Sequence, residues 1–366
     1  MKYFASLDGV RGLAILLVLS FHSSLNDFGW IGVELFFVLS GFLITRGLVQ
    51  DTELSWQHYL KRFYTRRFLR IFPIYYLYIA LIAVLALAFP GVVIFHPPAR
   101  FLWFAALAYL TNYACLFRLF TVFNHFWSLA LEEQFYLVWP YVVKGARRVL
   151  PAVALALIIL CPLLRAIAPY VMAHLGVPVA QRLFYIYMLP IAHTDGFAVG
   201  ALIAVTQRPW LRHPARWLAG SVLLLLLVGV AAQLSSLHGW QGYLRTFGYP
   251  GSLPLAHGWV YGYSLIFFTA GFLIVTVLEK NRITDLFSFS PLVYIGKISY
   301  GIYIYHILLR ALLLLVWPHI FATPAGACIL VTLSLGVAAA SFHFIETPIL
   351  ALKGRFAPTT RGITTA

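Results

Sequence analysis

The sequence predicts an all-α protein, a polytopic membrane bundle of about ten transmembrane helices with one re-entrant or dipping segment near residues 101–117. Of its 366 residues, 62% are hydrophobic and only 10% are charged, and the mean hydropathy is +0.87. A soluble domain of this size has about a quarter of its residues charged. The apolar residues gather into segments of roughly 20, the length at which a helix crosses a bilayer. Short basic clusters lie between these segments, which is typical of charges that set membrane topology.

Ten apolar segments match this length. The first follows a single lysine and is not followed by a small-residue cleavage site, so we expect a retained helix rather than a signal peptide. We expect residues 1–348 to form a single transmembrane domain and residues 349–366 a short polar cytoplasmic tail. In chain order, the expected spans are 10–26, 29–48, 71–89, 124–143, 150–169, 184–206, 216–234, 258–278, 291–316 and 325–345.

The apolar segment 101–117 decides the expected topology. If it crossed the membrane, the basic residues would be spread over both faces. If it returns to its own side and the amino terminus is cytoplasmic, the inner loops hold 19 of the 26 Lys and Arg residues. The positive-inside rule therefore favours a dipping segment and two cytoplasmic termini. The net charge of +15 then reflects topology, and we expect no nucleic-acid partner.

Three cysteines, Cys115, Cys161 and Cys328, are scattered through apolar segments. Their odd number and their spacing match neither a metal site nor a disulfide framework, so we expect them to pack against apolar neighbours. No metal site is expected.

The first two spans carry an ionisable pair, His22 and Glu34. His22 follows Arg11 by eleven residues, which places both within about 20° of one helix face and about 16 Å apart along the axis. A turn near Phe28 returns Glu34 to a similar depth, and Gly41 removes bulk below it. Ionisable groups inside a membrane are functional by default, so we predict a carboxylate-oriented imidazole. The alternative is that both side chains only hydrogen-bond to neighbouring helices.

A basic segment occupies residues 59–73, on the expected cytoplasmic side. Arg62, Arg66 and Arg70 recur at intervals of four and form one helix face, with Arg67 beside it. Guanidinium groups bind phosphates in a bidentate manner, so this face could hold a phosphorylated ligand. The alternative is a topology anchor that contacts anionic lipids.

Further polar residues interrupt the spans. Glu132 and Glu133 are adjacent carboxylates that cannot both face one partner, so we expect one to face a polar interior and the other a mouth or an arginine. His306 is either a site residue or a hydrogen-bonded core histidine. The other candidates for substrate-binding or structural polar contacts are Ser40, His193 and Asp195.

Six stretches, in order, resemble the integral-membrane acyltransferase family 3, which includes bacterial O-acetylases of cell-surface polysaccharides. They are LDGVRGLAILLVLSFH, GVELFFVLSGFLI, RRFLRIFP, WSLALEEQFYLVWP, SYGIYIYH and FIETP, and they cover nearly the whole chain. The resemblance implies ten transmembrane helices in the bacterial inner membrane. It also implies acyl-CoA, most commonly acetyl-CoA, as the cytoplasmic donor and an acceptor, often a sugar, at the far side.

The resemblance also carries residue roles to this chain. It places an essential histidine on His22 and an acidic position, commonly Asp, on Glu34. It places the carboxylate of a Trp-Ser-Leu motif on Glu132, which we expect to be the third catalytic residue beside His22 and Glu34. Its basic motifs fall on Arg11, Arg66, Arg67 and Arg70.

Two departures from the family pattern stand out. The sixth helix of the family usually carries Arg two residues before the acid, whereas this chain has His193 before Asp195, which leaves the role of that site open. Some members carry an extra extracytoplasmic hydrolase-like domain, and here we expect the acyltransferase domain only.

Residues and resemblance together predict a membrane O-acyltransferase. Coenzyme A phosphates would bind the arginines, and the acyl-pantetheine arm would enter past Gly41. His22, oriented by Glu34, would act as general base on the hydroxyl of an extracytoplasmic or lipid-linked sugar or glycoside. An acyl-histidine intermediate is a second route. The expected partners are acyl-CoA, this acceptor and the lipid bilayer.

Two other functions compete with this prediction. A proton-coupled transporter would use His22, Glu34 and Asp195 as a relay, but the sequence shows neither an internal repeat nor the paired broken helices of many transporters. A lipid-binding scaffold would explain the basic segment but not the acids inside the spans.

Overall fold

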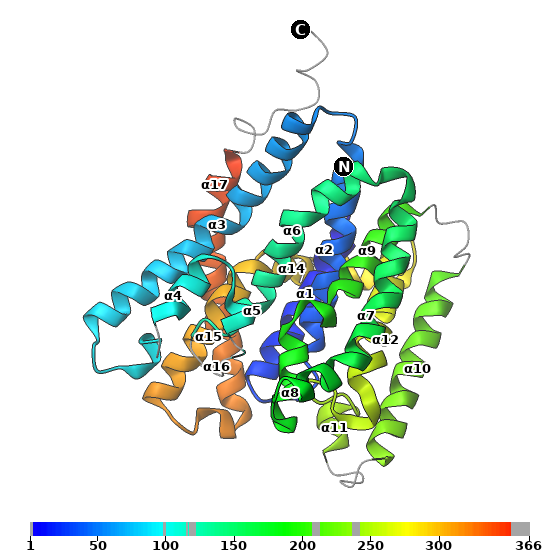
Figure 1. Ribbon diagram of the computed structural model, residues 1–366. Coiled ribbons are helices and arrows are strands. Elements are labelled where there is room, and N and C mark those ends of the chain that lie inside the picture. Colours follow the sequence, from blue (N-terminus) through cyan, green and yellow to red (C-terminus); the bar gives the residue numbers. More distant parts are fainter. Residues whose placement is uncertain are drawn as a thin grey trace.

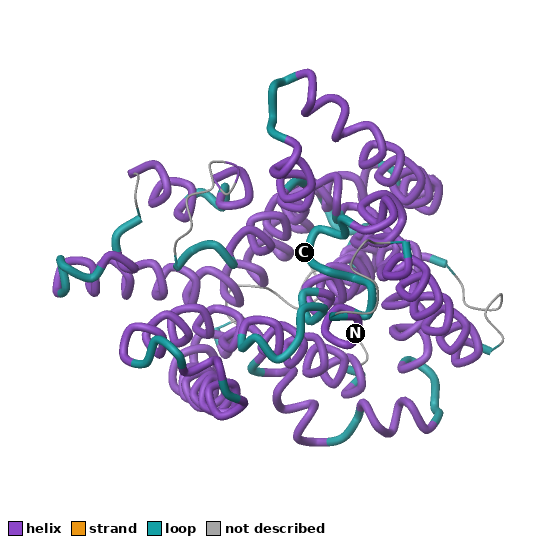
Figure 2. Tube along the Cα trace, turned by 90° about the horizontal axis from the view of Figure 1, so that it is seen from below, coloured by secondary structure: helices purple, strands orange, loops and turns teal. Residues whose placement is uncertain are grey.

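The computed structural model describes residues 3–97, 100–114, 116, 122–206, 213–235 and 242–352, and within these ranges every regular element is a helix (Figure 1, Figure 2). The predicted all-helical membrane bundle is therefore confirmed. In the described part of the chain, eight helical segments are long and apolar enough to cross a membrane. They contain α1 (Ala5–His22), α2 (Ile31–Gln50), α3 (Trp56–Ala88), α7 (Leu150–His174), α10 (Pro214–Leu234), α12 (Gly258–Val277), α15 (Ser299–Val316) and α16 (Pro324–Ser341).

The expected fourth and sixth spans are not among these eight. The fourth corresponds to α6 (Phe126–Gly145), a 20-residue helix that carries two glutamates and a glutamine. The sixth corresponds to α8 (Val179–Met188), η4 (Pro190–Ala192) and α9 (Thr194–Val205). The 12 residues of α9 reach about 18 Å, less than the hydrocarbon core of roughly 30 Å. The count of ten spans therefore stays a prediction.

The expected continuous helix over 184–206 is wrong, and Pro190 provides the physical reason. Proline has no backbone N–H and disfavours the helical conformation of the preceding residue. Leu189 accordingly has an extended backbone, with φ −93° and ψ 152°, and ends α8. The expected ninth span is also divided, into α14 (Ser290–Lys297) and α15, with Ile298 between them.

The segment expected to dip contains two short helices, α4 (Arg100–Leu107) and α5 (Thr111–Ala114). Their eight and four residues reach about 12 Å and 6 Å, too little to cross a bilayer. Backbone polar groups inside a membrane need partners. The Tyr75 hydroxyl donates to the last turn of α4 at 2.7 Å, and Gln134 donates to the Tyr109 carbonyl between the two helices at 3.1 Å. Residues 115 and 117 of the expected segment lie outside the described residues.

Helices α2 and α9 pack backbone to backbone at two glycines. A Cβ on Gly41 would lie 2.1 Å from the carbonyl oxygen of Phe197, and one on Gly200 would lie 2.0 Å from that of Val38. Small residues allow such close approach between membrane helices. The expectation that Gly41 leaves room for an acyl arm is therefore wrong, because α9 fills that space.

The described chain ends lie at one end of the bundle. The start of α1, the loop between α2 and α3, the loop between α6 and α7, and α17 (Thr347–Ala351) all lie toward the top of Figure 1. Residues 353–366 of the expected tail lie outside the described residues. The remaining short helices are η1 (Val93–Phe95), η3 (Arg147–Val149), α11 (Tyr243–Thr246), η6 (Leu255–His257), α13 (Arg282–Phe287), η7 (Ile320–Ala322) and η8 (Phe342–Glu346).

Candidate functional site

The candidate site consists of two cavities that meet inside the bundle. The arginine cavity has a volume of ≈ 110 Å³ and lies among α1, α2, α3, α6 and α15. The histidine cavity has a volume of ≈ 440 Å³. Val33 and Tyr303 line both cavities, so these two side chains form a common wall. The Tyr303 hydroxyl donates to the carbonyl of His125 at 2.7 Å and lies 2.5 Å from Ser128 Oγ, which fixes the aromatic half of this wall.

The arginine cavity holds charges of both signs. Ser40 donates to Glu132 Oε1 at 2.8 Å, and Tyr136 donates to Oε2 at 3.1 Å. Within the described residues, the buried Arg67 Nε and Glu133 Oε1 have no hydrogen-bond partner. Unsatisfied buried groups at a cavity are consistent with a polar ligand. The charged and hydroxyl residues that line this cavity are Arg11, Ser40, Arg67, Arg70, Ser128, Glu132, Glu133, Tyr136, Ser299, Tyr300 and Tyr303.

The structure separates the arginines that the sequence grouped. Arg67 and Arg70 line the arginine cavity together with Arg11. Arg66 does not line it and lies 3.7 Å from Asp51, which also pairs with Arg62 at 3.2 Å. The reason is that Asp51 directly follows α2 and draws the first two members of the predicted basic face away from the cavity.

Aromatic side chains are the commonest kind in the lining of the histidine cavity. Its aromatic walls come from Phe21, Trp30, Trp127, Phe184, Tyr187 and Tyr303. Its basic residues are His22, His125 and Arg310. An apolar, aromatic cavity with a few convergent polar groups is the usual form of a small-molecule site.

Hydrogen bonds to backbone carbonyls fix the ring nitrogens of two histidines. His22 Nδ1 lies 3.0 Å from the Val18 carbonyl oxygen, and His306 Nδ1 lies 2.8 Å from that of Tyr303. Because a carbonyl only accepts, both Nδ1 atoms carry the hydrogen. His306 Nε2 is then an acceptor, 3.3 Å from His22 Nδ1. His22 Nε2 keeps a free lone pair, with no partner among the described residues.

The expected hydrogen bond between His22 and Glu34 is wrong. Glu34 Oε2 lies 3.0 Å from His193 Nδ1, and both side chains are fully buried. His22 instead contacts His306 of α15. Residue counting about the turn gave the two side chains a similar depth, but it did not fix the direction in which each helix face points.

The buried pair of Glu34 and His193 shares a single proton. His193 Nε2 lies 2.6 Å from the Tyr187 carbonyl, so this nitrogen carries a hydrogen. The contact between Nδ1 and the carboxyl group then needs one more proton, on either partner. The rings of Phe37, Trp127 and Tyr187 surround the imidazole, with centroids at 4.9, 5.2 and 5.3 Å.

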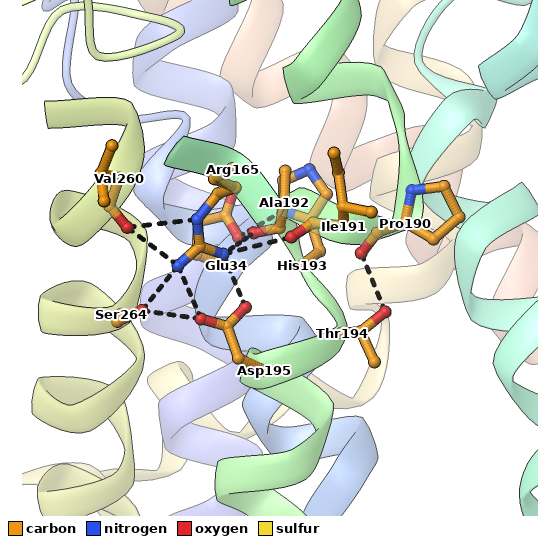
Figure 3. A network of polar contacts seen from close by, with 10 residues as sticks. All are labelled: Glu34, Arg165, Pro190, Ile191, Ala192, His193, Thr194, Asp195, Val260 and Ser264. Atoms are coloured by element: carbon orange, nitrogen blue, oxygen red, sulfur yellow. Dashed lines mark hydrogen bonds and ion pairs between the residues drawn. The ribbon is translucent and has the colours of Figure 1, made fainter. Parts of the chain in front are cut away.

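Arg165 was missed by the sequence analysis and is the centre of a buried polar network (Figure 3). Two of its nitrogens donate to the two carboxyl oxygens of Asp195, both at 2.8 Å, and neither side chain is exposed. It also donates to Ser264 Oγ at 2.6 Å and to the Ala192 carbonyl at 3.1 Å. The guanidinium thus satisfies backbone groups that the break before α9 leaves free.

The Arg165 network lies at the place where the sequence departs from the family pattern, next to His193. The family pattern usually has an arginine two residues before the acid, and here the guanidinium that pairs with Asp195 comes from α7 instead. His125 and Arg310 of the histidine cavity were missed as well. All three are ionisable residues in apolar segments, a signal that could have identified them.

Among the residues that the structure describes, no group of three or more His, Cys, Asp and Glu side chains is arranged to hold a metal ion. The three histidines near the cavity each direct one nitrogen at a backbone carbonyl: His22 at Val18, His306 at Tyr303 and, at 3.1 Å, His125 at Ile304.

Comparison with known proteins gives one consistent result. The family described as an acyltransferase domain matches residues 4–343. The peptidoglycan O-acetyltransferase OatA of Listeria monocytogenes is 30% identical over 95% of this chain and 56% of the relative. The putative peptidoglycan O-acetyltransferase YrhL of Bacillus subtilis is 28% identical over 95% and 55%. The O-acetyltransferase OatA of Staphylococcus aureus is 25% identical over 95% and 57%.

The chain spans little more than half the length of these curated relatives. No solved structure matches it.

Proposed function

The chain belongs to the acyltransferase domain family, and from this premise we propose that it is a membrane O-acetyltransferase acting on a carbohydrate of the cell envelope. The donor is a cytoplasmic acyl-CoA, with acetyl-CoA as the main candidate. The acceptor is a sugar hydroxyl presented from the other side of the membrane. The names of the relatives, which refer to peptidoglycan, support a glycan acceptor.

One observation carries this proposal: two cavities of different chemistry share the wall formed by Val33 and Tyr303. Acyl transfer between a charged donor and a sugar needs such a pair of compartments. Arg11, Arg67 and Arg70 provide cations for the phosphates of coenzyme A. The hydroxyl and carboxyl groups of the same cavity offer hydrogen bonds to the polar pantetheine arm, and Glu132 is already positioned by Ser40 and Tyr136.

The histidine cavity suits the acceptor. Its aromatic walls offer flat apolar faces to a sugar ring, and its polar groups are few enough to fix one orientation. His22 places a free Nε2 lone pair at this cavity, while Nδ1 is held by the Val18 carbonyl. The ring is therefore oriented without help from a carboxylate.

The chemical step that follows is general-base catalysis. His22 Nε2 takes the proton of the acceptor hydroxyl as the hydroxyl oxygen bonds to the thioester carbonyl carbon. The carbon–sulfur bond then breaks, and the imidazolium returns its proton to the sulfur, which leaves as the coenzyme A thiol. Such proton transfer contributes about 10²–10⁴ in rate. Attack of the imidazole itself, with an acyl-histidine intermediate, is the second route through the same residue.

In this proposal Glu34 does not orient His22, which is the role that its sequence position predicted. It pairs with His193, whose ring contacts Trp127 and Tyr187, two walls of the histidine cavity. We therefore assign Glu34 and His193 a positioning role, in which the buried pair holds these walls in place.

The transporter alternative needs a relay through His22, Glu34 and Asp195. The broken helix formed by α8, η4 and α9 is a feature that some transporters have. However, Asp195 is bound bidentately by Arg165 and accepts from Ser264 at 2.7 Å, so it has no free capacity to relay protons. Neither is Glu34 bonded to His22.

The test is acetyl transfer from labelled acetyl-CoA to a defined sugar, catalysed by the purified protein in lipid nanodiscs. We expect His22→Ala to lose at least about 10²-fold in turnover and to keep its affinity for coenzyme A. His96→Ala, in an exposed loop, is the matched control and should behave as the parent protein. Near-normal turnover of His22→Ala would contradict the proposed base.

A further inference from the structure

Arg310 is the one Asp, Glu, Lys or Arg among the described residues that line the histidine cavity. Its Nε donates to the backbone carbonyl of His22 at 2.7 Å, and its guanidinium packs 5.3 Å from the centroid of the Phe321 ring. In the part of the chain that the structure describes, no carboxylate pairs with it. The anchor through Nε leaves the two terminal nitrogens of the guanidinium without a hydrogen-bond partner among the described residues.

A comparison with Arg165 shows how few partners Arg310 has. Both arginines lie in apolar helices, α7 and α15. Arg165 is neutralised by Asp195 and also bonds to Ser264 and to backbone carbonyls. The Arg310 guanidinium, in contrast, bonds to one backbone carbonyl and packs against one aromatic ring among the described residues. Unlike Arg165, Arg310 is partly exposed, but it lines a cavity with few polar groups, where a cation without an anionic partner is costly. The partner of Arg310 is therefore expected from outside the chain.

We propose that the histidine cavity binds an acceptor that carries an anionic group, a carboxylate or a phosphate, and that the free nitrogens of Arg310 hold this group. The inference rests on the proposed function and names the class of its acceptor: an acidic or phosphorylated sugar. The planar guanidinium matches two oxygens of such a group in a fork-like, bidentate contact.

The position of Arg310 gives this contact a consequence for the reaction. Because its Nε is bound to the backbone of His22, the anion is fixed beside the residue that provides the general base. The ring of the same sugar then occupies the aromatic part of the cavity, which Trp30, Trp127 and Tyr303 line. One of its hydroxyls is thereby placed near His22 Nε2. Arg310 is thus a specificity residue for the acceptor.

A competing role is electrostatic stabilisation of the oxyanion that forms on the thioester carbonyl. That role would make Arg310 important for every acceptor, charged or neutral, and would change kcat rather than KM. A purely structural role, through the bond to the His22 carbonyl, would likewise affect all acceptors alike. The preference for charged over neutral acceptors therefore separates the proposal from both.

The experiment compares N-acetylmuramic acid with its methyl ester, and N-acetylglucosamine 1-phosphate with N-acetylglucosamine, as acceptors for the full chain in nanodiscs. We expect the charged member of at least one pair to have a KM at least 10-fold lower. In Arg310→Met this ratio should fall to near one, and Arg310→Lys should retain part of it. Arg182→Met is the matched control, because Arg182 also donates its Nε to a backbone carbonyl, that of Val177 at 2.9 Å, but lies outside both cavities.

Equal KM values for charged and neutral sugars in the parent protein would overturn the inference, as would an equal loss of kcat on all acceptors in both Arg310 variants. The carboxylate and phosphate pairs identify which anion is bound. Calorimetric titration of the same four sugars into His22→Ala provides a readout without turnover. Charge-dependent binding that Arg310→Met removes would support the anion site even if no transfer occurs, in which case only the proposed function fails.

Discussion

At the scale of single residues, the imidazole ring of His22 makes both of its polar contacts with the described residues through one nitrogen. Nδ1 faces the Val18 carbonyl and His306 Nε2, at 3.0 and 3.3 Å. A backbone carbonyl four residues earlier in the same helix cannot move independently of the ring. The base is therefore oriented by its own helix and by α15, and Glu34 belongs to a separate pair with His193.

This separation predicts the pattern of couplings in double-mutant cycles. Glu34→Gln and His193→Ala should couple by more than about 1 kcal/mol in the free energy of unfolding, since contacting residues in one network are not additive. Glu34→Gln and His22→Ala should be additive within about 0.5 kcal/mol. Denaturation of the three single and two double variants in mixed micelles measures both couplings. A strong coupling of Glu34 to His22 would restore the catalytic pair that the sequence suggested.

The second residue-scale prediction concerns the ion pair of Arg165 and Asp195. Arg165→Met leaves the buried carboxylate of Asp195 without its partner and should lower the free energy of unfolding by about 3–5 kcal/mol. The double variant Arg165→Met, Asp195→Leu removes both charges and should recover much of this loss. Arg182→Met, which breaks no ion pair, is the control. If the double variant lost as much unfolding free energy as the two single variants together, Arg165 and Asp195 would not act as a unit.

At the scale of elements, the close contact of α2 with α9 gives the third prediction. In Gly200→Ala a methyl group would have to occupy space 2.0 Å from the Val38 carbonyl oxygen, so the two helices must separate. Overpacking of this kind costs about 1–3 kcal/mol of unfolding free energy. Gly336→Ala in α16 is the matched control, because no atom lies within 4 Å of its added Cβ. Replacement of a mid-helix glycine there should be neutral or stabilise by up to about 1 kcal/mol. Equal effects of the two substitutions would contradict the packing.

The elements also show what the sequence could and could not predict. Length and hydropathy placed most helices, because burial in lipid acts on each segment separately. The expectation that 101–117 does not cross came instead from the distribution of the basic residues. The break at Pro190 was readable from the proline itself. The direction of each helix face was not readable, because it depends on packing against distant segments. For this reason the partners of Glu34 and Arg165, and the separation of Arg66 from the cavity, appeared only in the structure.

At the scale of the whole molecule, the arginine cavity predicts how the donor binds. Replacing both Arg67 and Arg70 by Gln removes two phosphate contacts of about 1.5–3 kcal/mol each, so the affinity for coenzyme A should fall by about 10²-fold or more. Arg62→Gln is the control, since Arg62 pairs with Asp51 outside the cavity. Equilibrium binding of labelled coenzyme A measures the affinity of the double variant and of this control. An unchanged affinity in the double variant would move the donor away from this cavity.

The central claim is that donor and acceptor reach His22 from opposite sides of the membrane, through the arginine cavity and the histidine cavity. Its most direct test is acetyl transfer in sealed vesicles of uniform orientation, with a sugar acceptor trapped inside and membrane-impermeant labelled acetyl-CoA added outside. Labelling of a cysteine placed at Gln57, close to the start of α3, reports the orientation independently. The account predicts transfer when the Gln57 side faces the donor and none when the vesicles are reversed. Transfer only when acetyl-CoA and the sugar are on the same side would contradict it.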